Sequence, residues 1–265
     1  MGKLTKAVKA FQLILKKPAL LNLVLDYEEN YKKLVLEKYN LTSGLKRIHF
    51  DQFLSEVNTV DPFTFLEGGS LPTDYLLLSA LSKKLNRPTC FEIGTWRGES
   101  ALNMERFAKH VYTLNLSPDE LKQLGFDKAY ADMQGSMCKG KETITQLWGN
   151  SFNFNFEEYK SRCDLVFVDG DHHYKSVVND TKIAFDLIRN DESVIVWHDY
   201  GNGTETVRWE VLLGILDGTP EEKRKHLYAV NNTLCAIYYP YPVESFTASF
   251  PQSPENIYKV IIEKS

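Results

Sequence analysis

The chain has 265 residues, of which 43% are hydrophobic and 25% charged, and its formal net charge is −4. This composition is that of a globular protein and excludes a disordered tail, a collagen and a coiled-coil rod. A slightly acidic chain does not attract nucleic acid, and no uncharged run approaches the roughly 18 residues of a membrane span. We therefore expect neither nucleic acid nor membrane as a partner.

Residues 1–70 form a helix-rich zone. Residues 1–17 mix basic and apolar positions without a signal-peptide cleavage site, which predicts an amphipathic helix. From Pro18 to Val35, apolar residues recur at three- and four-residue steps, which predicts a second helix. The four cysteines are far apart and form no CxxC pair, so no zinc clamp is indicated. This cysteine usage favours a reducing, cytoplasmic location.

From about residue 73 the pattern alternates between strand and helix, which predicts an α/β fold with a doubly wound, mainly parallel sheet. The last two strands are too close for a helical crossover, so they must pair as an antiparallel hairpin. The expected strands span residues 89–93, 111–116, 143–148, 164–168, 193–197, 227–230 and 233–238. The expected helices span residues 73–85, 100–108, 176–188 and 204–216.

Polar residues follow the first five of these strands. In doubly wound sheets, ligands bind beyond the carboxyl ends of the strands, at the point where the strand order reverses. We therefore expect a binding site built from residues 92–98, 115–117, 150–151, 169–174 and 198–203. Gly68 to Pro72, just before the first helix of this region, line its entrance or form an ordinary linker turn.

The first strand ends in Glu92-x-Gly94-x-x-x-Gly98. This spacing differs from the G-x-G-x-x-G of nicotinamide enzymes, and it lacks the Gly-Lys-Ser/Thr of a phosphate loop. Glycines at a strand–helix junction allow close approach to a ligand, although a tight turn without a ligand gives the same pattern.

This loop resembles the cofactor loop of class I S-adenosylmethionine-dependent methyltransferases. The phrases DLVFVDGDHHY at 164–174 and VIVWHDY at 194–200 are similar to a bacterial branch that includes small-molecule and sugar O-methyltransferases. The resemblance covers about residues 64–240. It implies a Rossmann-like, seven-stranded methyltransferase domain at 71–265 behind a helical N-terminal extension at 1–70. The extension would cover the site or make a homodimer contact.

The resemblance implies S-adenosylmethionine as the cofactor. The glycines would admit its methionine part, and Glu92 would organise the loop and hold the ammonium group directly or through water. Asn115 stands where many relatives carry an acidic residue for the ribose, so its bond should be weaker. The residues expected to bind the cofactor are Glu92, Gly94, Thr95, Gly98, Asn115, Asn150, Ser151 and Asp169.

The expected catalytic residues are His172, Asp169 and Asp199. A histidine at a strand end is suited to take a proton from the methyl acceptor near neutral pH, although His172 could equally cap the following helix. We expect Asp169 and Asp171 to stabilise the imidazolium that results.

The resemblance also suggests a site for a divalent metal. In catechol-type and macrolide-sugar methyltransferases, magnesium is bound at places similar to Asp169, His198 and Asp199. Because magnesium prefers oxygen ligands, His198 favours manganese, iron or zinc instead.

The resemblance implies methyl transfer to an oxygen of a small molecule or sugar. Two alternatives stay open: a metal-dependent hydroxylase-like enzyme on the same scaffold, and a non-catalytic cofactor-binding or interaction protein.

Overall fold

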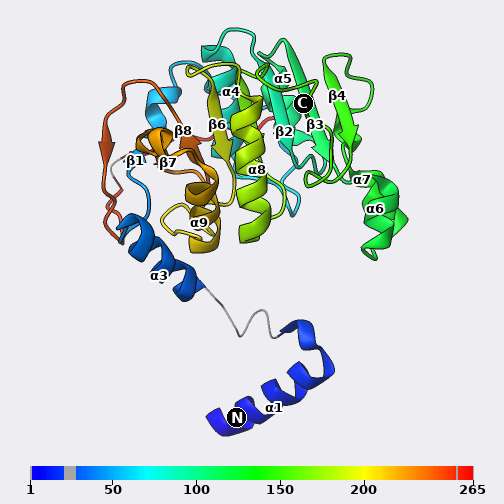
Figure 1. Ribbon diagram of the computed structural model, residues 1–265, viewed down its shortest axis with the longest axis vertical. Coiled ribbons are helices and arrows are strands. Elements are labelled where there is room, and N and C mark those ends of the chain that lie inside the picture. Colours follow the sequence, from blue (N-terminus) through cyan, green and yellow to red (C-terminus); the bar gives the residue numbers. More distant parts are fainter. Residues whose placement is uncertain (1, 21–27, 255, 265) are drawn as a thin grey trace.

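A computed structural model describes residues 2–20, 28–254 and 256–264 (Figure 1). Its centre is a nine-stranded sheet in the order β4-β3-β2-β5-β6-β8-β7-β1-β9. Strands β2 to β6 are parallel, whereas β8 runs antiparallel to both β6 and β7, as predicted for the last hairpin. The strands are β1 (Arg47–Ile48), β2 (Thr89–Ile93), β3 (His110–Asn115), β4 (Ile144–Trp148), β5 (Leu165–Val168), β6 (Val194–Trp197), β7 (Leu227–Val230), β8 (Ala236–Tyr238) and β9 (Ser245–Phe246).

The sheet has two more strands than the seven predicted. β1 pairs parallel with β7, and β9 pairs antiparallel with β1. Each has only two residues, too few for an alternating pattern to be recognised. Since β1 belongs to the first 70 residues, that zone contributes a strand to the sheet as well as helices, and the predicted division at residue 70 stays a prediction.

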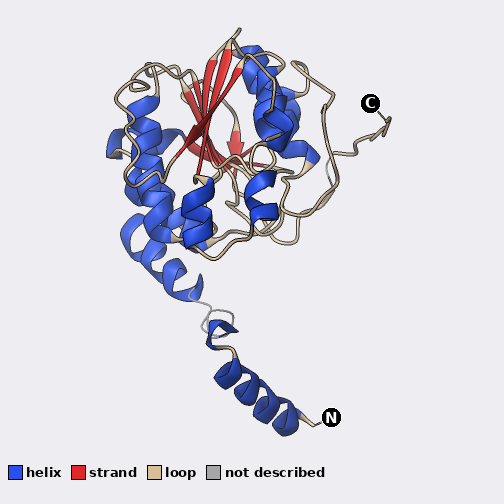
Figure 2. Cartoon of the chain, turned by 90° about the vertical axis from the view of Figure 1, so that its right-hand side faces the viewer, coloured by secondary structure: helices blue, strands red, loops and turns tan. Residues whose placement is uncertain are grey.

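Helices cover both faces of the sheet (Figure 2). On β5, Val166 and Val168 pack in one hydrophobic cluster with α8 and α9, while Leu165 and Phe167 pack in the other with α4 and α5. A strand that is apolar on both faces lies between two helical layers, which confirms the doubly wound α/β class. The helices of these layers are α4 (Pro72–Lys84), α5 (Glu99–Glu105), α8 (Tyr174–Leu187) and α9 (Trp209–Gly218).

The remaining helices lie at the N-terminus and after β3. They are α1 (Lys3–Lys16), α3 (Glu28–Tyr39), α6 (Pro118–Gln123) and α7 (Lys128–Met133), with 3-10 helices at Pro18–Leu20, Phe50–Phe53, Ser136–Cys138 and Glu221–His226. α1 confirms the amphipathic helix predicted for residues 1–17. Part of the helix predicted after Pro18 falls on residues 21–27, outside the described residues.

α3 packs against α9 and fixes where that helix begins. The backbone N–H of Trp209 donates a hydrogen bond of 2.5 Å to Glu28 Oε2, and Lys38 pairs with Asp217 at 2.8 Å. The prediction that this helix starts at Thr204 was therefore wrong by five residues. A homodimer contact by the extension stays a prediction. In the described part of the chain, no helix is long and apolar enough to cross a membrane.

Candidate functional site

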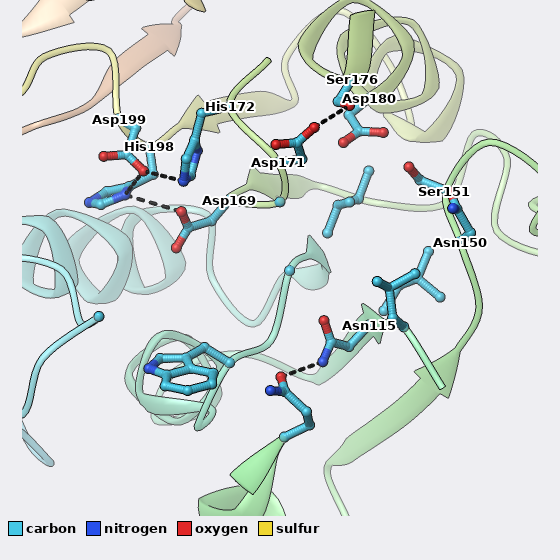
Figure 3. Close-up of a pocket in the computed structure, with 18 of the residues that line it drawn as sticks. Asn115, Asn150, Ser151, Asp169, Asp171, His172, Ser176, Asp180, His198 and Asp199 are labelled. Atoms are coloured by element: carbon cyan, nitrogen blue, oxygen red, sulfur yellow. Dashed lines mark hydrogen bonds and ion pairs between the residues drawn. The ribbon is translucent and has the colours of Figure 1, made fainter. Parts of the chain in front are cut away.

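The order of the strands reverses between β2 and β5, because β3 and β4 lie on one side of this pair and β6 on the other. A cavity of about 850 Å³ opens at the carboxyl ends of these strands. This volume is within the usual range for a small-molecule site. Its lining includes the predicted residues Gly94, Asn115, Asn150, Ser151, Asp169, His172, His198 and Asp199, together with Gly68, Gly69 and Ser70 (Figure 3).

Three of the residues predicted to bind the cofactor do not line this cavity. Thr95 is buried, with its Oγ1 2.6 Å from Thr113 Oγ1. Gly98 caps α5 at a φ of +96°, and a Cβ added there would lie 2.3 Å from Cys138 Sγ. Both residues therefore lie beneath the turn rather than in the lining of the cavity, and a contact of either with the cofactor stays a prediction.

Glu92 is the third and is completely buried. Its carboxyl group is hydrogen-bonded to the hydroxyls of Ser100 and Thr113, so it ties β2 to α5 and to β3. Burial raises its pKa to about 8, against the opposing effect of these hydrogen bonds. Glu92 therefore organises the loop from beneath the cavity, and its contact with the ammonium group of a cofactor stays a prediction.

Gly94 lets the ends of β2 and β5 meet. Its φ is +99°, and an added Cβ would lie 2.0 Å from the carbonyl oxygen of Asp169. The Asp169 N–H in turn donates to the carbonyl of Ile93 at 2.8 Å. Only glycine allows this approach, which positions Asp169 at the rim of the cavity.

Four predicted residues come together at one end of the cavity, where Figure 3 shows their side chains facing one another. His172 Nε2 lies 3.1 Å from Asp199 Oδ2. His198 Nδ1 lies 3.1 Å from Asp169 Oδ1 and 3.3 Å from Asp199 Oδ2. Burial alone would lower the pKa of His198, but the charge of Asp169 and contacts with Asp199 raise it well above its ordinary value. Burial would raise the pKa of Asp199, yet His198, His172 and Arg208 lower it to about 2.

Asp74 on α4 is a functional residue that the sequence reading missed. It is fully buried, and its carboxylate accepts the backbone N–H groups of Leu71 at 2.7 Å and Leu234 at 2.8 Å. Its Oδ2 lies 3.2 Å from His198 Nε2. An acidic residue three positions into a helix is typical of a helix cap, and this pattern concealed its contact with His198.

Asp169, His198 and Asp199 also fit a divalent metal. Each offers one ligand atom, and these atoms lie within 4.8 Å of one another. His198 Nδ1 is buried and makes no hydrogen bond of good geometry, despite the two nearby carboxylates. Asp74 on the other ring nitrogen matches the carboxylate–histidine–metal arrangement of known sites. One nitrogen and two carboxylate ligands suit manganese, iron or zinc.

Asp171 was expected to stabilise the His172 imidazolium, but its carboxylate contacts other residues. Its Oδ1 lies 2.6 Å from His173 Nδ1, and its Oδ2 accepts a hydrogen bond of 2.7 Å from Ser176 Oγ. This arrangement fixes the start of α8 and leaves Asp199 as the carboxylate that contacts His172.

The other end of the cavity is built from amides. Asn115 Nδ2 donates a 2.5 Å hydrogen bond to Gln134 Oε1, and Asn179 Nδ2 lies within 3.4 Å of Ser151 Oγ. Asp180 is buried beside Ser151, and its burial raises its pKa. The sequence reading missed Asp180, although its position three residues after Val177 places it on the inward face of α8.

The outer wall of this end comes from α6 and α7, which were not predicted. Its apolar and aromatic residues are Leu121, Leu124, Phe126 and Tyr130, with Trp96 beside them. Ser117 and Glu120 form a capping box around Pro118, which is the signal that could have located α6. Phe152 also lines the cavity, whereas Phe156 is buried in the core.

Among the described residues that line the cavity, four aspartates outnumber two histidines. Asp169, Asp171, Asp180 and Asp199 line it, and no lysine or arginine does so among the described residues. Such a cavity attracts a cation and disfavours phosphates.

Comparison with known proteins points the same way. Residues 91–200 match the model of the family described as Methyltransferase domain. This segment runs from β2 to just beyond β6 and contains Gly94, Asn115, Asp169, His172 and Asp199. No curated protein matches the chain.

Solved structures similar to the chain have low identity. The YcgJ protein from Bacillus subtilis is 12% identical over 45% of this chain and 48% of its own, with a TM-score of 0.32. The SAH-bound Podospora anserina methyltransferase PaMTH1 is 16% identical over 72% of this chain and 85% of its own, with a TM-score of 0.45. The O-methyltransferase from Bacillus cereus in complex with SAH is 15% identical over 77% and 94%, with a TM-score of 0.44. The chain spans about half the length of the YcgJ protein that it matches.

Proposed function

We propose that the protein is an S-adenosylmethionine-dependent methyltransferase acting on an oxygen of a small molecule. The observation that carries this proposal is the acidic cavity at the reversal of strand order, whose described lining has four aspartates and two histidines but no lysine or arginine. S-adenosylmethionine bears a sulfonium cation, whereas nicotinamide and nucleoside-phosphate cofactors bear phosphates. The match of residues 91–200 to a methyltransferase domain supports the same choice.

The two ends of the cavity would bind different parts of the cofactor. Asn115, Asn150 and Ser151 offer uncharged donors and acceptors to an adenosyl group, against the apolar wall that includes Leu121. The opposite end, with Asp169 and Asp199, would face the sulfonium group. When bound, S-adenosylmethionine would supply the methyl group as an electrophile, and His172 lines this end of the cavity beside Asp199.

His172 would receive the acceptor proton in this proposal. Its Nε2 lies 3.1 Å from Asp199 Oδ2, so in this mechanism Nε2 would carry the ring proton and Nδ1 the lone pair. Asp199 holds the ring in this tautomer and stabilises the imidazolium that forms as the acceptor oxygen takes the methyl group. Positioned bases of this kind contribute about 10²- to 10⁴-fold to a rate.

Asp169, His198 and Asp199 would hold a divalent cation beside this base. When bound, the cation would supply a Lewis acid that favours the ionised form of an acceptor hydroxyl. Asp74 would keep His198 oriented as a ligand through its Nε2.

Calorimetric titration tests the proposal. We expect saturable binding of S-adenosylmethionine and no binding of ATP at the same concentrations. Asn115→Ala should weaken the binding by about tenfold because it removes a hydrogen-bonding group, whereas Asn58→Ala, an exposed change away from the cavity, should not. Absence of S-adenosylmethionine binding at millimolar concentration, or tighter binding of ATP, would contradict the proposal.

A further inference from the structure

Helix α1 presents an apolar stripe that no described residue covers. Leu4, Val8, Phe11 and Leu15 follow one another at steps of four, three and four residues, which places them on one helix face. Their exposed fractions are 80%, 51%, 63% and 67%, and no residue of the helix is buried. In Figures 1 and 2 the helix lies away from the sheet and its covering helices.

The opposite face of α1 is basic. At 3.6 residues per turn, Lys6, Lys9 and Lys16 lie across the helix from the apolar stripe. Residues 1–25 hold five lysines and no acidic residue, although the whole chain has a net charge of −4. Residues 1–25 therefore carry a net charge of +5 and residues 26–265, with 26 basic and 35 acidic residues, a net charge of −9.

We propose that α1 binds the surface of an anionic lipid bilayer. The helix would lie in the plane of the interface, with the apolar stripe inserted among the acyl chains and the lysines near the lipid phosphates. Its 14 residues are too few to span a bilayer, so the attachment is peripheral. The proposal replaces the expectation of no membrane partner, which rested only on the lack of a spanning segment.

The charge pattern favours an anionic bilayer over a second copy of the chain as the partner of the apolar stripe. A dimer formed through the stripe would bring two lysine-rich helices together without an acidic residue on either to offset their repulsion. An anionic bilayer supplies both an apolar layer for the stripe and negative charge for the lysines. The binding does not depend on the cavity or on methyl transfer.

Co-sedimentation of the full chain with vesicles tests the proposal. The chain should sediment with phosphatidylcholine vesicles that contain phosphatidylglycerol and not with vesicles of phosphatidylcholine alone. Leu15→Gln, on the stripe, should weaken the partition by about tenfold. Leu13→Gln makes the same chemical change on the lysine face and should alter it less than twofold. Lys9→Gln should weaken it by about fivefold.

Three results would overturn the proposal. One is no sedimentation of the wild-type chain with the anionic vesicles. A second is an equal loss for Leu15→Gln and Leu13→Gln, because the stripe would then not be the inserted face. The third is an oligomer in solution that Leu15→Gln dissociates while sedimentation is unchanged, which would assign the stripe to a second copy.

Discussion

Replacing Gly94 with alanine should both destabilise the fold and damage the site. The added Cβ would lie 2.0 Å from the carbonyl oxygen of Asp169, and real Cβ contacts do not fall below 3.0 Å. The ends of β2 and β5 must therefore separate by about 1 Å. We expect a loss of about 1–3 kcal/mol in the free energy of unfolding for this overlap. The positive φ of +99° should add about 1–2 kcal/mol.

Gly140→Ala is the matched control, because Gly140 has a φ of +79° and an added Cβ would meet nothing within 4 Å. Its free energy of unfolding should fall only by the amount that the positive φ contributes. Urea unfolding of both variants gives two losses in the free energy of unfolding, and their difference measures the overlap between the added Cβ and the Asp169 carbonyl oxygen. Because Asp169 moves with the strand end, Gly94→Ala should also lower methyl transfer by about 10²-fold. Equal stabilities of the two variants, with unchanged activity, would refute this reasoning.

Three further predictions concern the base, the buried carboxyl and the metal. His172→Asn should lower turnover by about 10²- to 10⁴-fold with unchanged cofactor affinity, and His173→Asn should leave turnover near wild type; equal effects on turnover would remove His172 as the base. The raised pKa of Glu92, about 8 in the fold against 4.5 ordinarily, means that the folded state binds the proton more tightly. This stabilisation is complete below pH 4.5 and is lost as the pH rises through 8, by up to about 1.4 kcal/mol per pH unit. Between pH 5 and pH 8, the free energy of unfolding measured in urea should therefore fall more for the wild type than for Glu92→Gln. Equal falls for the two proteins would contradict the raised pKa of Glu92. Asp199→Asn should weaken Mn²⁺ binding in calorimetry by at least about tenfold, whereas Asp171→Asn should not; the opposite order would place the ion elsewhere.

Most of the sheet could be predicted because its central strands are apolar on both faces. β5, predicted at 164–168 and observed at Leu165–Val168, is fully buried between two helical layers, and its pattern indicated both its type and its central place. The strand ends then located the cavity, since parallel strands bring their carboxyl ends to one edge. For this reason Asn115, Asp169 and His198, far apart in the sequence, were predicted together and lie along one cavity.

Contacts between distant elements could not be predicted in this way. Nothing near Thr204 in the sequence shows that Glu28 binds the start of α9 at Trp209. The side chain of Glu92 follows the alternation of its strand, but only the packed structure shows that α5 and β3 enclose it. Asp74 reaches His198 from α4, which precedes β2, and no spacing in the sequence links the two residues.

A crystal structure of the protein with SAH, the demethylated product of the cofactor, tests the central claim most directly. The account predicts the adenosyl group between Asn115 and Asn150, with the sulfur atom directed toward Asp169. It also predicts that the space between that sulfur and His172 is left for the methyl acceptor. SAH bound outside the cavity, or a cavity without SAH in crystals saturated with it, would contradict the account.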